Sequence, residues 1–217
     1  MERHSFAMEI KKGKKNDYRQ ILGEIWPDLT AFLDQEKVHN FSIWNCDSLI
    51  FGYYETDKNN EFSEEKKASI QALTSRIDHT FTWISTPGEN MRLMYHNFGV
   101  VRENKELIRH RMFITRLKPD CEEEYKARHD GLVAAREGRI DPGPDSNFSI
   151  WSAGGYIFGY DEIDTNMETE ETPEAHEATV SWETRQLGIM DWITNDCDWL
   201  TGTVHSASVR LAWHMGK

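Results

Sequence analysis

The stretch NFSIW at residues 40–44 returns unchanged at residues 147–151. An identity of five residues that includes Asn, Phe and Trp is hard to explain by chance in 217 residues. The same offset, the difference between 147 and 40, also aligns NFSIWNCDSLIFGYYETD with NFSIWSAGGYIFGYDEID. The sequence therefore predicts a tandem duplication, with copy one at residues 1–101 and copy two at residues 108–217.

Both copies show the same expected order of elements: strand, helix, strand, strand, helix, strand. The first helix of copy one covers residues 15–35, where apolar residues recur at helical spacing on both sides of Pro27. A hairpin follows around NCDS in copy one and around SAGG in copy two. A second helix is expected over residues 64–85, and MRLMYHNF at residues 91–98 is the expected closing strand.

This element order predicts the fold class. A β-α-β-β-α-β unit with an antiparallel sheet is ferredoxin-like, which makes the chain an α+β protein with two such repeats. Helices cover one face of each sheet and leave the other face bare, so units of this kind often pair sheet to sheet. We therefore expect an intramolecular dimeric α/β barrel, an internal pseudo-dimer for which further homo-oligomerisation stays open.

The charge and hydropathy of the chain exclude several classes of partner. The formal net charge is −12 with a pI near 5.2, and Lys and Arg are scattered, which argues against nucleic acid as a partner. No apolar run reaches the length of a membrane span, and the start MERHSFAMEIKKGKK has no apolar core of a signal peptide. These features predict a cytoplasmic protein that does not bind membranes.

Cysteine and histidine spacing gives no sign of a metal or cofactor site. Cys46, Cys121 and Cys197 have no paired spacing, so neither a disulfide framework nor a zinc site is expected. The nine histidines form no H-x-x-x-H or H-E-x-x-H pair. A Gly-rich phosphate loop and a G-x-S-x-G motif are also missing, which argues against nucleotide enzymes and serine hydrolases.

The first helix of copy two contains the strongest candidate for a catalytic residue. The apolar face of the first helix contains Leu22 in copy one, and His129 occupies the equivalent position in copy two. Tyr125 lies one helical turn before His129. Histidine titrates near neutral pH and can act as a general acid or base, with the tyrosine orienting it. The alternative interpretation is a core histidine whose polar atoms are satisfied by the tyrosine.

Polar and aromatic residues around the hairpins are candidate ligands for a sugar. Asn40 and Asn147 begin equivalent strands, where an amide could bind a hydroxyl group or cap a turn. Tyr160 and Glu162 share a strand face by alternation, and they could line a polar pocket or lie at a solvent edge. Trp192, the counterpart of Trp83, is expected on the second helix, where packing into the core is the alternative to binding.

These residues together resemble the L-rhamnose mutarotase family. The run FAMEIKKGKKNDYRQILGEIWPDLTAFLDQEKVHNFSIW, followed by LIFGYYE, is similar to the strand of that family, its helix with Y-x-x-x-H-x-x-I-W-P, and its His-Asn-aromatic strand. The resemblance covers each copy nearly end to end. It implies a dimeric α/β barrel that interconverts the α and β anomers of L-rhamnose without a cofactor, with the helix histidine as acid and base.

Carried over residue by residue, the family motif is split between the copies. The family residues kept in copy one are Tyr18, Ile25, Trp26, Pro27, His39 and Asn40, with Leu22 at the histidine position. Those kept in copy two are Tyr125, His129 and Asn147, while Leu132, Val133 and Ala134 replace I-W-P and Ser146 replaces the histidine before Asn. The family's tryptophan pair of the second helix is absent as a pair, with Trp192 near its place.

The resemblance thus implies that copy two holds the site. Its catalytic residues would be His129 and Tyr125, and its substrate a monosaccharide. The implied substrate-binding residues are Asn147, Trp151, Tyr160, Glu162, Trp192, Tyr18, Trp26 and Asn40. Two other functions stay open: a lyase, dehydratase or monooxygenase on the same barrel, and a non-catalytic sugar-binding protein.

Overall fold

The computed structural model describes residues 1–58, 63–102, 104–195 and 208–213. The chain divides into two compact units, the first formed by Met1–Met91 with Val209–Lys217 and the second by Arg92–Ser208. Within the described residues, no helix combines the length and the apolar character needed to cross a membrane.

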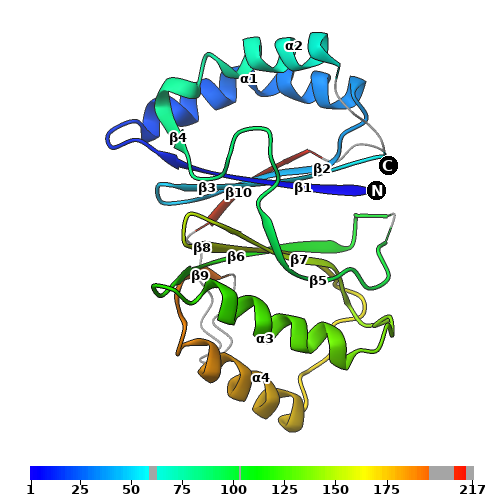
Figure 1. The fold of residues 1–217 in the computed structure, drawn as a ribbon. Coiled ribbons are helices and arrows are strands. Elements are labelled where there is room, and N and C mark those ends of the chain that lie inside the picture. The colour runs from blue at the N-terminus through cyan, green and yellow to red at the C-terminus, as the bar shows by residue number, and fades with distance from the viewer. Residues whose placement is uncertain (59–62, 103, 196–207, 214–217) are drawn as a thin grey trace. The chain divides into compact units, whose positions relative to one another are not determined.

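The first unit is an antiparallel sheet with both helices on one face (Figure 1). Its elements in chain order are β1 (Glu2–Ile10), α1 (Lys15–Gln35), β2 (His39–Cys46), β3 (Leu49–Thr56), α2 (Glu64–Thr74), η1 (Asp78–Thr80), β4 (Phe81–Trp83) and β10 (Ser208–Trp213). The strand order is β10-β2-β3-β1-β4. The predicted first helix is confirmed as one continuous helix that includes Pro27.

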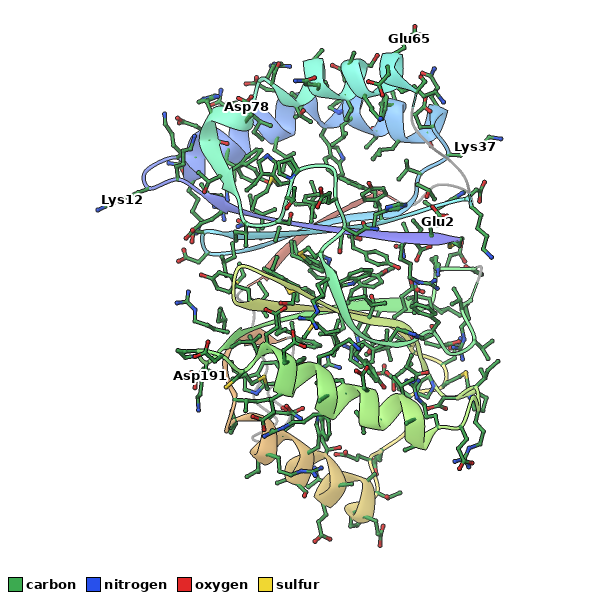
Figure 2. All side chains as sticks on the ribbon, viewed as in Figure 1. Glu2, Lys12, Lys37, Glu65, Asp78 and Asp191 are labelled. Atoms are coloured by element: carbon green, nitrogen blue, oxygen red, sulfur yellow. The ribbon has the colours of Figure 1, made fainter. Side chains whose placement is uncertain are left out.

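The second unit repeats this plan, with α3 and α4 on one face of its own sheet (Figure 1). Its elements are β5 (Arg92–Asn97), β6 (Ile108–Leu117), α3 (Glu122–Ala135), β7 (Asp145–Ala153), β8 (Tyr156–Asp164), α4 (Pro173–Gln186) and β9 (Met190–Asn195). The strand order is β5-β7-β8-β6-β9. The two ferredoxin-like repeats of the α+β prediction are therefore present. In both units, side chains fill the space between the sheet and its helices (Figure 2).

The closing strands differ from the sequence prediction in their partners. Residues 91–98 do form a strand, β5, but β5 pairs with β7 in the sheet of the second unit. Strand β10, at the end of copy two, lies beside β2 in the sheet of the first unit. The sequence pattern of a strand identifies its faces but not its neighbour, and both sheets offer an equivalent edge strand.

Two element assignments from the sequence are corrected by the structure. The second helix of copy one ends at Thr74, and Trp83 lies on β4 rather than on a helix, as its counterpart Trp192 lies on β9. The acidic run TNMETEETPEAHEA at residues 165–178, whose composition is typical of a solvated loop, is partly helical, because α4 begins within it at Pro173. Thr172 caps this helix by accepting a hydrogen bond from the Ala175 N–H, and proline is favoured in the first helical turn.

A phenylalanine packed over a glycine explains why both copies contain IFGY. Gly52 and Gly159 are the glycines of this motif, and each lies opposite a phenylalanine of the neighbouring strand, Phe6 or Phe113. A Cβ atom at either glycine would lie 1.9 Å from the phenylalanine ring. Glycine is therefore required at both positions by the close approach of the ring rather than by a turn.

Candidate active site

His129 lies on the face of α3 that packs against the sheet, and its side chain is buried. Its Nδ1 is 2.9 Å from the carbonyl oxygen of Tyr125, one turn earlier in the helix. Because a carbonyl can only accept, Nδ1 must carry the proton and donate it. The neutral imidazole therefore has its lone pair on Nε2, which is the nitrogen left to contact a ligand.

Three aromatic side chains surround this imidazole. The Tyr125 ring stacks on it with the centroids 4.2 Å apart, and Tyr95 and Trp182 each meet it edge to face at 5.3 Å. These rings come from three elements, α3, β5 and α4. They keep water from the imidazole and restrict its rotation.

A cavity of about 70 Å³ opens beside His129, between the helices and the sheet of the second unit. Its wall is mostly aromatic and aliphatic, and the polar side chains in it besides the tyrosines are His129, Glu183 and Gln186. Pockets for small ligands usually start at roughly 300 Å³, so a whole monosaccharide would have to displace lining side chains. An apolar wall with a few polar groups matches a sugar, which has apolar faces and hydroxyl edges.

The two polar residues of α4 in this wall are both buried, with Glu183 3% and Gln186 1% exposed. Neither the nitrogen nor the oxygen of the Gln186 amide has a hydrogen-bond partner among the described residues. A buried polar group without a partner costs about 1–3 kcal/mol. The wall thus contains an amide that an apolar side chain of similar size would replace at a gain in stability.

Copy one lacks this set of polar residues at the equivalent positions. Leu22 occupies the position equivalent to His129, and Ile77 occupies the position equivalent to Gln186. The second correspondence follows from matching backbone bonds, since Thr80 N–H donates to the Ile77 carbonyl as Ile189 N–H donates to the Gln186 carbonyl. Leu22 and Ile77 both belong to the hydrophobic core of the first unit. The polar cavity wall is therefore particular to copy two.

Comparison with known proteins places most of the chain in one family. A sequence model described as L-rhamnose mutarotase matches residues 3–90 and 110–211, one match for each copy. The chain belongs to the L-rhamnose mutarotase family. By family, it is an isomerase.

Individual relatives are similar over shorter stretches. An L-rhamnose mutarotase of Oceanobacillus iheyensis is 32% identical over 72 residues, which cover 32% of this chain and 69% of the relative. One of Agrobacterium fabrum is 40% identical over 55 residues, covering 24% of this chain and 50% of the relative. A solved structure described as a putative monooxygenase of Fusobacterium nucleatum aligns over 99% of this chain and 94% of that chain, with a TM-score of 0.42 and 10% identity.

The structure brings together only part of the site that the mutarotase resemblance implied. Tyr125, His129 and Trp192 all line the cavity. Tyr160 and Glu162 lie on the other face of the sheet, because Tyr160 pairs with Met112 while the cavity residue Phe113 pairs with Gly159. Trp151 pairs with Phe158 on that same face, and its indole N–H donates to the Ser149 hydroxyl.

The asparagine that both copies share belongs to a second buried group in each copy. The Asn147 amide donates to Glu162 at 3.1 Å, and the Tyr160 hydroxyl donates to the same carboxylate at 2.9 Å. In copy one, the same two contacts join Asn40 and Tyr53 to Glu55. Both asparagines have a positive φ and lie where the strand pairing shifts register. The same arrangement occurs in both copies, whereas the polar residues of the cavity wall do not.

The remaining residues implied from copy one lie in the first unit. Tyr18 is part of its hydrophobic core, and Trp26 packs against that core with its ring 6.2 Å from Phe41.

The sequence interpretation missed Tyr95, Trp182, Glu183 and Gln186 in the cavity wall. The offset that aligns Trp83 with Trp192 also pairs Ile77 with Gln186, but beyond the insertion in copy two this offset rests on a single aligned tryptophan.

Burial also changes the protonation of His129. It lowers the pKa of His129 to about 4, against the opposing effect of the hydrogen bond to the Tyr125 backbone. The imidazole is therefore neutral at neutral pH, in the state of a base. For Tyr125, burial first and the charge of Glu183 second raise the pKa, so its hydroxyl keeps its proton.

This lowered pKa predicts how stability changes with pH. Unfolding returns the imidazole to water, so between about pH 6.5 and pH 4 the unfolded chain binds more protons than the folded one. Lowering the pH through this range should therefore destabilise the protein by on the order of 3 kcal/mol through His129. Urea unfolding of wild type and His129→Leu at pH 7 and pH 4.5 checks this. The variant should lose less stability on acidification, and equal losses would contradict the burial of a neutral histidine.

Proposed function

We propose that the second unit interconverts the α and β anomers of a monosaccharide in the cavity beside His129, with this histidine as the acid and base. The observation that carries the proposal is a buried, neutral imidazole with its Nε2 lone pair left for a ligand. Membership of the L-rhamnose mutarotase family supports the reaction type. Relatives named L-rhamnose mutarotase support L-rhamnose or a similar sugar as substrate.

The reaction requires one proton to move from one oxygen of the sugar to another. Nε2 of His129 takes the proton of the hydroxyl on the anomeric carbon, and the electron pair left on that oxygen forms the carbonyl as the bond to the ring oxygen breaks. The imidazolium then gives the proton to the ring oxygen. The aldehyde turns about its bond to the next carbon, and the reverse steps close the ring on the other face.

The surroundings of His129 suit this exchange of protons. The neutral imidazole is the base that starts ring opening, and the imidazolium it becomes is the acid that completes it, so one residue can serve both oxygens, which are bonded to the same carbon. The protonated hydroxyl of Tyr125 can donate a hydrogen bond but cannot act as a base at neutral pH. The aromatic wall keeps water away from the open-chain aldehyde.

The direct test is anomer exchange measured by saturation-transfer NMR on L-rhamnose, L-fucose and unsaturated uronic sugars. We expect enzyme-dependent exchange for at least one of them, with kcat/KM constant between pH 6 and pH 8 because His129 is already deprotonated there. Exchange on none of these sugars by folded protein would refute the proposal. Saturable binding without exchange would instead assign the unit to sugar binding.

A further inference from the structure

The Gln186 side chain is held in the cavity wall by its backbone. Gln186 is the last residue of α4, and its carbonyl accepts a hydrogen bond from the Ile189 N–H at 2.8 Å. The adjacent Leu187 N–H donates to the Glu183 carbonyl at 3.0 Å. The backbone of the turn that ends the helix therefore has a hydrogen bond before and after Gln186. Gln186 is 1% exposed, so its amide lies inside the protein.

The fold itself does not need an amide at this place. Ile77 has the same backbone hydrogen bond in copy one, is 4% exposed, and packs into the core with Leu22. Polar groups buried in native proteins almost always have hydrogen-bond partners, and an exception calls for a structural or functional reason. An amide with both ends unpartnered among the described residues, in the wall of a cavity, is such an exception.

The chemistry of the amide defines the ligand group that would satisfy it. An amide has a donor and an acceptor side by side, and two neighbouring hydroxyls of a sugar offer the matching acceptor and donor. Glu183, three residues earlier on the same helix face, adds a carboxylate that can only accept when it is ionised. Trp182 and Trp192 provide ring surfaces for the apolar side of a sugar.

We propose that Gln186 binds a pair of adjacent hydroxyls of the sugar and thereby selects substrates that carry both. This rests on the proposed function only in taking the ligand to be a monosaccharide. A sugar that lacks either hydroxyl leaves one end of the amide unpaired. Gln186 therefore sets which aldoses are bound, while His129 acts on the anomeric carbon.

The test compares wild type with Gln186→Ile, which introduces the residue of copy one, and with Gln186→Met, which keeps the length of the side chain. L-rhamnose and its single-deoxy derivatives are titrated by calorimetry, and the thermal midpoint is measured without sugar. Gln71→Ile on α2 is the control, because it makes the same exchange at an exposed position of the first unit. It should leave sugar binding unchanged.

We expect wild type to bind one or two deoxy derivatives about 10 to 100 times more weakly than L-rhamnose. Gln186→Ile and Gln186→Met should bind L-rhamnose at least about tenfold more weakly, lose this discrimination, and show a higher thermal midpoint without sugar. Unchanged affinities in both variants, or no binding of any of these sugars by wild type, would overturn the proposal.

The outcome also separates this inference from the proposed function. Binding that depends on Gln186 without anomer exchange would support hydroxyl selection and refute catalysis. Anomer exchange with the same KM for L-rhamnose and its deoxy derivatives in wild type and both Gln186 variants would support catalysis and refute hydroxyl selection.

Discussion

Replacing His129 by leucine is expected to lower the anomer exchange rate by a factor of roughly 10² to 10⁴. This is the range that a positioned general acid and base contributes, and the variant removes the only imidazole in the cavity wall that the structure describes. The protein should stay folded, because Leu22 fills the same helix position in copy one and packs in its core. Saturation-transfer NMR measures the rate, and circular dichroism verifies the fold.

The matched control for this variant is His176→Ala. His176 also lies on a helix of the second unit, but it is exposed and pairs with Glu171 rather than lining the cavity. Its removal should leave exchange at the wild-type rate. If His129→Leu also exchanged anomers at that rate while folded, His129 would have no part in the chemistry.

The repeat and most elements of the fold follow from sequence, because both depend on local patterns. Alternation along the hairpin strands placed Tyr160 and Glu162 on one face, and the strand register agrees. Alternation does not tell which face the helices cover, so the sequence alone cannot show that these residues lie on the face opposite to His129. The partners of β5 and β10 were missed for a similar reason, since pairing is decided by contacts distant in sequence.

The candidate site was predictable only where the two copies align without insertions. His129 was found because the first helix aligns with copy one residue for residue, which set it against Leu22. Gln186 lies beyond the insertion in copy two, where the sequence pairs it with Ile77 only through the single match of Trp83 with Trp192, and a matching backbone hydrogen bond establishes that pairing. Tyr95 could not be foreseen in the site, because β5 was expected to close the sheet of copy one.

Substituting Gly159 by alanine is expected to slow sugar exchange strongly, because the new methyl group would displace the Phe113 ring in the cavity wall. The new Cβ would lie 1.9 Å from Cε1 of Phe113, so the phenylalanine ring must leave its place on the glycine. Phe113 lines the cavity, which at about 70 Å³ has little room for a displaced ring. We expect exchange to fall by roughly 10²-fold, and stability by about 1–3 kcal/mol through overpacking.

Gly52→Ala is the matched variant that separates loss of the cavity from loss of stability. Its Cβ would lie equally close to a ring, that of Phe6, but this pair belongs to the first unit and not to the wall around His129. Urea unfolding should show a similar loss of stability for the two variants, whereas NMR should show loss of exchange only for Gly159→Ala. If both variants lost exchange equally under conditions where they are folded, the activity would depend on the integrity of both units, and the cavity in the second unit would not be sufficient for catalysis. If neither lost it, the sugar would not occupy the space beside Phe113.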